Sequence, residues 1–497
     1  MPHTPTRHLG PALICALLCG SFLGFYSFFL ERLPYNIDEG VSILNARLIG
    51  LGMRPYVDFF YHQLPLHMLL LSLISPLSPD SLFLHRLPSL LAIAATGWVV
   101  YRIGRRMAPA STALMAVALF YFVPLQFHGL LAMPNGLMMF FSTLSVYLIV
   151  FREEQRWVIL GSVCLVIAVL FKPLALATLA AIALTLFLQA DQRRKLRPVM
   201  LIVALGGFSS WLLLHILSEG YFTEMLGLQL HRYTYKTFFE RMTGFTAIHD
   251  RVPFLSLTSF FSWNLYSHAQ AFSSANLGIL VTALCGTWAV WGKAGSITRG
   301  DKRLLAWWLL FPLLFSLFVW EPAWMHYHIQ YLPALSILGA LFLQRLWSAE
   351  KFRVALRLAA VFWMALYVAL GVLAVRANAA DYGHVRELKP SARELLTFDP
   401  FLNFLTHTEP ACGLTDPMAQ TMPSFYRGKA RFRRFIKTPG VIIECLEESP
   451  ETQILISRRF TMFFIDGELH SYLSRLDEGR VIYLTQEDEA AFHGLFE

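Results

Sequence analysis

The sequence has few charged residues and few cysteines. Asp, Glu, Lys and Arg together make up 15% of the 497 residues, whereas hydrophobic residues make up 56%. This composition is typical of a polytopic membrane protein. None of the six cysteines shows zinc-ligand spacing. Four of them lie in apolar runs, where a cysteine acts as a small buried hydrophobe: Cys15, Cys19, Cys164 and Cys285.

The net charge of +8 comes from short clusters of Lys and Arg between the apolar runs. Such clusters stay in the cytoplasm according to the positive-inside rule. Membrane topology therefore explains the basic charge, and a nucleic-acid partner is not expected. The clusters lie at residues 102–106, 152–156, 193–197, 293–303 and 345–353.

The apolar runs between these clusters predict about eleven membrane-spanning helices. They cover residues 10–30, 87–101, 110–126, 136–151, 157–171, 174–190, 199–217, 273–291, 304–320, 331–346 and 354–375. The first run follows Arg7 and lacks a cleavage site, so it is predicted to be an uncleaved signal anchor with a cytoplasmic N-terminus. An odd number of crossings then places residues 377–497 outside the cytoplasm.

The apolar segment 64–77 does not fit this alternation. A helix of its length would be about 20 Å long, short of the roughly 30 Å hydrocarbon core. A crossing here would also move the following basic cluster to the wrong side. We therefore expect a juxtamembrane helix at the outer surface.

Non-basic polar residues gather in the predicted outer loops. Clusters of this kind next to a membrane indicate a functional site. They comprise Asp38, Glu39, His62 and Gln63 in the first loop, Asn135 in the second and residues 321–330 in the fifth. A lone lysine, Lys172, lies in the third loop on the same side.

Several short stretches, in this order, carry a resemblance to a known family. They are "DEG…A…G…PY.DF…HQ.PL" from residue 38, "RLPSLL…Y.IGRR" from residue 86, "PNGLMMF" from residue 134 and "FKP" from residue 171. The chain resembles bacterial GT-C glycosyltransferases of the protein mannosyltransferase and aminoarabinose transferase type over about residues 10–375. The resemblance implies transfer of a sugar from a polyprenyl-phosphate donor at the outer face of the bacterial inner membrane.

The resemblance places Asp38 at the position of the family's catalytic base. General-base catalysis is commonly worth about 10²- to 10⁴-fold in rate. Adjacent residues on a helix point about 100° apart, so one of the two acids can face the substrate. Asp38 is predicted to take the proton from the acceptor. Glu39 is predicted to orient Asp38 or to bind a second substrate group.

The phosphate of a lipid donor requires a fixed positive charge beside it. Lys172, between two apolar runs and before Pro173, is the first candidate; the alternative is a lysine that extends to the membrane surface. Arg86, at the outer start of a span, is the second candidate, although an ordinary interface anchor would look the same.

Further substrate contacts are predicted in two stretches. His326, Tyr327 and His328 lie at the outer end of a span, where the family carries a similar stretch. His62 and Gln63 belong to the strongest part of the resemblance. Interface residues without a catalytic role would fit the same positions.

Asn135 departs from the family, which often has an aspartate at this place. An asparagine can bind a sugar hydroxyl but supplies no negative charge. A metal site built from two carboxylates is therefore disfavoured, and we expect an enzyme without a metal or other cofactor. Asn135 also leaves open a catalytically inactive relative that acts as a scaffold.

Residues 377–497 have a mixed polar composition and predict a small α/β domain outside the cytoplasm. Cys412 and Cys445 would lie in an oxidising compartment, and the sequence leaves open whether they pair. The domain organisation predicted is thus a transmembrane glycosyltransferase domain, 1–376, followed by a soluble domain, 377–497.

Two other functions remain as alternatives. A transporter or lipid flippase would also be polytopic, but such proteins usually show internal repeats and polar residues near the membrane centre, which this sequence lacks. A glycan ligase or polymerase would use a diphosphate-linked lipid instead. The sequence does not determine the sugar or whether the acceptor is a protein, a lipid or a glycan.

Overall fold

The computed structural model describes residues 9–33, 35–61, 63–223, 276–291, 298–315, 325–349, 393–397, 399–415, 439–457, 467–477 and 479–493, and isolated residues between 353 and 373. The chain forms two compact units. The first comprises Met1–Leu33, Arg86–Trp211 and Phe260–Arg376, and the second comprises Pro34–His85, Leu212–Ser259 and Ala377–Glu497.

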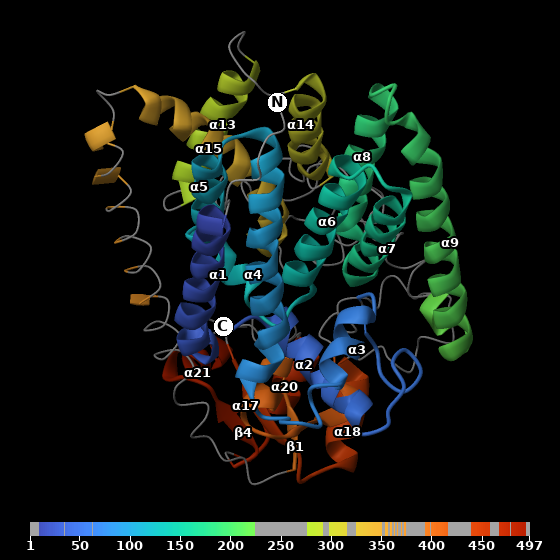
Figure 1. The fold of residues 1–497 in the computed structure, drawn as a ribbon. Helices are drawn as coiled ribbons and strands as arrows, with labels where there is room; N and C mark the ends of the chain where they lie inside the picture. Colours follow the sequence, from blue (N-terminus) through green and yellow to red (C-terminus); the bar gives the residue numbers. More distant parts are fainter. Residues whose placement is uncertain are drawn as a thin grey trace, which may run out of the picture. The chain divides into compact units, whose positions relative to one another are not determined.

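Long apolar helices dominate the first unit (Figure 1). They are α1 (Leu9–Phe29), α4 (Leu82–Met107), α5 (Ala110–Tyr121), α6 (Pro134–Phe151), α7 (Gln155–Phe171), α8 (Leu176–Leu188), α9 (Arg193–Leu217), α13 (Leu277–Trp291), α14 (Arg299–Leu314) and α15 (Leu332–Ser348). Helix α4 begins, and α9 ends, in the second unit. Each helix coincides with a predicted span. Within the described part of the chain, five helical segments are long and apolar enough to cross a membrane, and the total of eleven crossings stays a prediction.

Glycines let the helices of the first unit approach closely. Helix α6 packs on α7, and α13 packs on α15. A Cβ atom on Gly161 of α7 would lie 2.7 Å from the side chain of Ile149 in α6. Gly286 of α13 lies directly against the backbone carbonyl of Leu338 in α15. A larger side chain at either glycine would push the paired helices apart, because protein interiors have no spare volume.

The predicted cytoplasmic clusters come together at one end of these helices. Lys195 at the start of α9 donates hydrogen bonds to the carbonyl oxygens of Ile149 (3.2 Å) and Arg152 (2.7 Å) at the end of α6. Arg303 of α14 donates to the carbonyl oxygen of Leu188 at the end of α8 (3.1 Å). Cations near helix C-termini are favourable because the carbonyl groups there carry partial negative charge.

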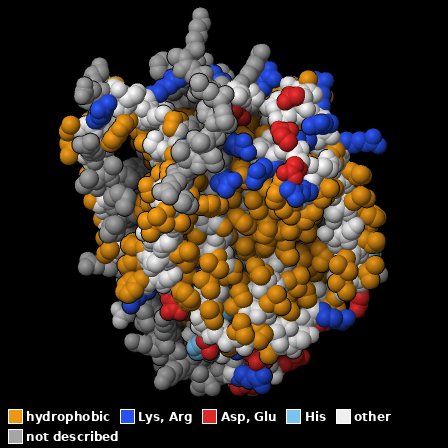
Figure 2. Space-filling view, viewed as in Figure 1, with side chains coloured by type: hydrophobic (Ala, Val, Ile, Leu, Met, Phe, Trp, Pro, Cys, Tyr) orange, Lys and Arg blue, Asp and Glu red, His pale blue; other side chains and the backbone are white. Residues whose placement is uncertain are grey.

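The sides of the helices expose apolar residues. Figure 2 shows hydrophobic side chains across much of the helical face in view and charged side chains near the ends of α8 and α14. Helix α9 is the extreme case, because only 6% of its most apolar stretch is buried in the protein. A contiguous exposed apolar surface of this extent indicates contact with lipid.

Short 3-10 helices connect the long helices at the end opposite the basic clusters. They are η2 (Pro124–Gly129) before α6, η3 (Pro173–Ala175) after α7 and η6 (Met325–Tyr331) before α15. Helix η2 packs against η6, and α6 contacts both η3 and η6. Polar residues from three separate connections are thereby brought together.

The second unit combines the first predicted outer loop with the C-terminal tail. The loop contains α2 (Ile37–Gly50) and α3 (Leu66–Ser72). Helix α3 is shorter than the helix predicted over residues 64–77. It begins after Pro65, and turns follow it up to Leu77. Pro76 contributes to this end, because a proline has no N–H to donate to the carbonyl oxygen of Ser72, four residues before it.

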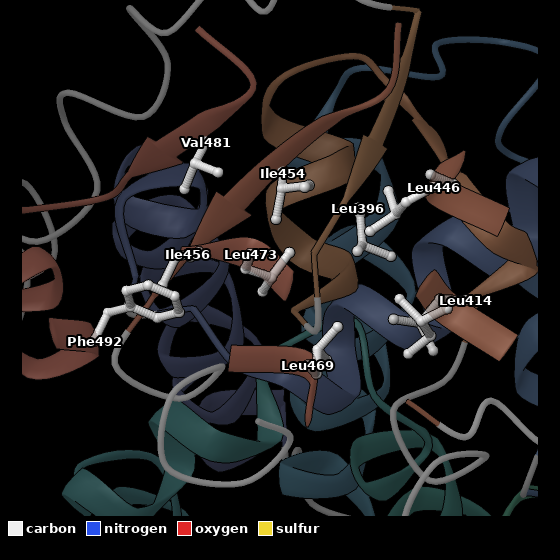
Figure 3. Packing of buried hydrophobic residues seen from close by; sticks show 11 residues of the cluster. Leu396, Leu414, Leu446, Ile454, Ile456, Leu469, Leu473, Val481 and Phe492 are labelled. Carbon is white, nitrogen blue, oxygen red and sulfur yellow. The ribbon is translucent and has the colours of Figure 1, made fainter. Parts of the chain in front are cut away.

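The tail contains a four-stranded parallel sheet with strand order β2-β1-β3-β4. Its elements are β1 (Glu394–Leu396), α17 (Pro400–Leu405), β2 (Glu409–Pro410), η9 (Ala411–Gly413), α18 (Pro439–Glu448), β3 (Gln453–Ile456), α20 (Gly467–Leu473), β4 (Val481–Tyr483) and α21 (Gln486–His493). Figure 3 shows apolar side chains of these elements packed into one core, including Leu396, Ile454 and Leu473. The tail thus contains both helices and strands, as its sequence predicted; a separate outer domain at 377–497 stays a prediction.

A disulfide joins Cys412 in η9 to Cys445 in α18, so the pairing that the sequence left open is present. It closes a loop with a sequence separation of 33 residues. Replacing both cysteines by serine is expected to destabilise the second unit by about 3 to 4 kcal/mol, because the unfolded chain regains the entropy of that loop. Thermal unfolding of the purified protein, with and without reductant, measures the loss. An equal melting temperature for the variant and the oxidised wild type would contradict the prediction.

Candidate active site

The predicted site residues fall into two groups, one in each unit. The first unit holds Arg86, Asn135, Lys172 and residues 326–328, and the second holds Asp38, Glu39 and Gln63. His62 lies outside the described residues.

Lys172 is the centre of the first group. It follows the last residue of α7 in an extended conformation, and Pro173 then starts η3. This places the lysine at a turn, as the sequence predicted. Its side chain is buried nevertheless, with 7% of the residue exposed. A buried ammonium group is costly unless polar or anionic groups surround it.

Two neutral groups contact the Lys172 ammonium. Its Nζ donates a hydrogen bond of 2.8 Å to Oδ1 of Asn135, the second residue of α6. It also lies 3.9 Å from the centre of the Tyr327 ring in η6, in a cation–π contact. The Lys172 side chain is thus held between α6 and η6.

Asn135 has further hydrogen-bonding capacity. The residue is fully buried, and its Nδ2 has no hydrogen-bond partner among the residues that the structure describes. The side-chain amide nitrogen of an asparagine can donate two hydrogen bonds, and buried donors are normally bonded. Asn135 Nδ2 is therefore placed to donate to a ligand oxygen beside the lysine.

Histidines and glycines complete the first group. The His326 ring meets the Tyr327 ring edge-on at 4.5 Å, and the His328 ring stacks on Tyr331 at 5.7 Å. A Cβ atom on Gly136 would lie 2.6 Å from the carbonyl oxygen of Gly129, so α6 and η2 touch through backbone here. This close approach fixes Asn135, the neighbour of Gly136.

Sequence reasoning missed two buried amides in the same connections. Gln126 of η2 is fully buried and donates to the Phe120 carbonyl oxygen (2.9 Å). Gln330 of η6 is buried, and its Nε2 has no hydrogen-bond partner within the described part of the chain. Gln330 lay inside the polar stretch 321–330, but its burial was not visible from the sequence.

His128 also belongs to η2. Burial lowers the pKa of the His128 imidazole to about 4, so this side chain is neutral at neutral pH.

Arg86 binds the end of a short helix. It is fully buried, and its Nη1 donates to the carbonyl oxygens of Leu30 (2.6 Å) and Leu33 (3.2 Å), where η1 (Leu30–Arg32) ends. These bonds satisfy carbonyl groups at the end of a helix. They give Arg86 a structural role, and its binding of phosphate stays a prediction.

The second group is the acidic first turn of α2. Asn36 caps the helix by accepting a hydrogen bond from the Asp38 backbone nitrogen (2.8 Å). Glu39 is fully buried, whereas Asp38 is half-buried. The two neighbouring acids therefore face different surroundings, as the helical geometry predicted. Both carboxylates are favoured at a helix N-terminus, where backbone N–H groups carry partial positive charge.

Other polar residues line α2 and its neighbour α3. Ser42 and Asn45 follow Asp38 on the same helix and are fully buried, and so is His67 of α3. Gln63 accepts a hydrogen bond at its backbone oxygen from the Tyr56 hydroxyl (2.8 Å), which ties the loop before α3. The predicted contact of Gln63 with substrate stays a prediction.

Among the described residues, no group of three or more His, Cys, Asp or Glu could hold a metal ion.

Comparisons with known proteins bear on the class of this protein. Residues 62–214 match the family model for dolichyl-phosphate-mannose-protein mannosyltransferase. The matched segment contains Asn135 and Lys172. A comparison with the sequences of curated proteins finds no match.

Two solved structures resemble the chain at low sequence identity. The oligosaccharyltransferase from Archaeoglobus fulgidus, crystallised with zinc and sulfate, has a TM-score of 0.51 and 13% identity; 82% of this chain and 62% of that one are covered. ArnT from Cupriavidus metallidurans, bound to undecaprenyl phosphate, has a TM-score of 0.48 and 13% identity, with 99% and 89% covered. The chain thus spans less than two thirds of the archaeal enzyme.

These findings confirm the resemblance to GT-C glycosyltransferases that the sequence motifs indicated. The family model matches part of the chain, and the solved structures show a likeness of fold. Together with the apolar helices, they show a membrane protein whose fold resembles that of the archaeal oligosaccharyltransferase.

Proposed function

We propose that this protein transfers one sugar from a polyprenyl-monophosphate donor to an acceptor outside the cytoplasm, in the inner membrane of a bacterium. The observation that most strongly supports this proposal is the buried Lys172 ammonium between Asn135 and Tyr327. It lies within the segment that matches a family named for a lipid-monophosphate sugar donor.

The reaction requires one bond to form as another breaks. The acceptor hydroxyl attacks the anomeric carbon of the sugar, and the bond from that carbon to the phosphate oxygen breaks. Asp38 takes the hydroxyl proton, and the lipid phosphate leaves with its electron pair. The geometry that supports Asp38 as base is its half-buried position in the first turn of α2, beside the fully buried Glu39.

Lys172 would stabilise the negative charge that grows on the leaving phosphate. A preorganised cation in a site from which water is excluded stabilises such charge far more than it could in water. Asn135 Nδ2 would donate to a phosphate or sugar oxygen, and the Tyr327 ring would hold the lysine in place. His326 and His328 would complete the surroundings of the donor.

The disulfide supports the proposed orientation. Disulfides persist in oxidising compartments and are rare in the cytosol. The bond between Cys412 and Cys445 therefore favours a tail outside the cytoplasm. The Lys195 and Arg303 contacts gather basic residues at the end of the helices away from η2, η3 and η6, in agreement with the positive-inside rule. The acceptor would then be a protein, lipid or glycan on the outer side.

A panel of donors tests the proposal. Membranes that contain the protein are incubated with radiolabelled sugars on polyprenyl monophosphate and on polyprenyl diphosphate, and label in lipid, glycan and protein fractions is counted. We expect transfer from at least one monophosphate donor and none above background from the diphosphates. Membranes without the protein are the control. Transfer from diphosphate donors alone, or from no donor, would refute the proposed function.

A further inference from the structure

Phe401 of α17, in the tail, contacts the residues on both sides of the acidic turn of α2. Its ring lies 4.3 Å from that of Tyr35, directly before the Asn36 cap. Its backbone lies against Gly40, directly after the acidic pair. Phe401 is almost completely buried. Its contacts therefore bracket the turn that carries Asp38.

The approach at Gly40 requires a glycine. A Cβ atom there would overlap the backbone nitrogen, the Cα and the Cβ of Phe401. Backbone atoms cannot move aside as the end of a flexible side chain can. Glycine inside a helix is otherwise unfavourable, so its place in the fourth position of α2 is explained by this contact.

Helix α17 is itself fixed to the sheet. Asp399 caps it by accepting a hydrogen bond from the Phe401 backbone nitrogen (3.0 Å). The buried Asn403 side chain donates to the Leu395 carbonyl oxygen of β1 (3.0 Å) and to the Glu409 carbonyl oxygen of β2 (3.3 Å). A short helix held at its start and at its centre provides a rigid support.

More contacts between the tail and the first loop surround this point. The Thr415 hydroxyl donates to the Phe60 carbonyl oxygen (3.2 Å), and His407 Nδ1 lies 2.8 Å from Asp80 Oδ1. Because the contacts are spread over α17 and the residues after it, the loop is supported over a broad area.

We propose that Phe401 is a positioning residue for Asp38, and that the tail sets the geometry of the catalytic turn through the contact between Phe401 and Gly40. The inference rests on the proposed function, in which Asp38 is the base. A base displaced by about 1 Å can lower the rate about 100-fold without a change in binding. The tail would thus contribute to catalysis without touching the substrate.

A pair of glycine variants tests the contact within one helix. Gly40→Ala introduces a Cβ against the Phe401 backbone, whereas Gly50→Ala, at the end of the same helix, meets nothing within 4 Å. We expect Gly40→Ala to lower kcat at least tenfold with KM for the lipid donor within twofold of wild type. Gly50→Ala should keep both values. Equal kcat for the two variants would overturn the inference.

A second pair removes the support from the other side. Phe401→Ala is compared with Leu473→Ala, which truncates a buried residue of the sheet core to which Phe401 does not belong. Rates are taken per folded molecule, with the folded fraction measured by size-exclusion chromatography. We expect kcat to fall at least tenfold in Phe401→Ala, to recover in part in Phe401→Leu, and to stay within twofold in Leu473→Ala. Equal losses in Phe401→Ala and Leu473→Ala would show a purely structural role and overturn the inference.

Asp38→Asn in the same assay separates this inference from the proposed function. Loss of transfer in Asp38→Asn with normal kcat in Gly40→Ala and Phe401→Ala would refute the positioning role and leave the base assignment intact. Full transfer by Asp38→Asn would refute the base assignment itself.

Discussion

Asp38→Asn is expected to lower the rate of sugar transfer by about 10²- to 10⁴-fold, the usual contribution of a general base. Asparagine keeps the size of the side chain and can still accept a hydrogen bond, but it cannot take a proton at neutral pH. Because Asp38 is half-buried at the helix start, the substitution should leave the packing of α2 unchanged. Initial rates in membranes with matched amounts of protein measure the effect.

Glu39→Gln is the matched control for Asp38→Asn. It makes the same chemical change one residue along α2, at a fully buried side chain. We expect it to retain more activity per folded molecule than Asp38→Asn. A larger loss of rate in Glu39→Gln than in Asp38→Asn would show that Glu39, and not Asp38, is the base.

Lys172→Met is expected to lower kcat with the lipid donor by about 10²- to 10³-fold, as the loss of one group that stabilises developing charge does in other enzymes. Methionine fills a similar volume and removes the ammonium that contacts Asn135 and Tyr327. Single-turnover rates at saturating donor separate this loss from weaker donor binding. An unchanged rate at saturation would contradict the role assigned to Lys172.

Lys195→Met is the control for Lys172→Met. Lys195 is also a buried lysine, but its ammonium donates to carbonyl oxygens at the opposite end of the helices. The variant should lose stability, because those carbonyl groups lose their partner, while the rate per folded molecule stays near that of wild type. A similar loss of rate in both variants would point to a general effect of removing buried charge.

The long helices could be predicted from the sequence because each carries its own signal. A run of about twenty apolar residues specifies a membrane helix without reference to the rest of the chain. The turn at Lys172 was predictable for the same reason, since Pro173 and the two flanking apolar runs are local features. The acidic pair in the first turn of α2 could likewise be identified, because its two residues are adjacent in the sequence.

The contacts around these residues could not be predicted, because they join distant segments. The sequence did not show that Tyr327 lies beside Lys172 or that Asn135 binds its ammonium. Gly40 was part of a motif, but the need for a glycine there follows from the backbone of Phe401. The helix predicted over residues 64–77 was too long, because the chain changes from a helix to turns after Ser72, within the same apolar run.

The contact between Gly40 and Phe401 also has a consequence for biogenesis. Helix α2 emerges from the ribosome early in synthesis, whereas α17, β3 and β4 emerge near its end. The strand β1 that supports α17 has β3 as a neighbour in the sheet, and β4 pairs with β3 in turn. The acidic turn therefore acquires its support only after almost the whole chain has been made and its tail has folded. Activity would appear as the last step of maturation, so a nascent chain in the membrane could not yet consume its lipid substrate.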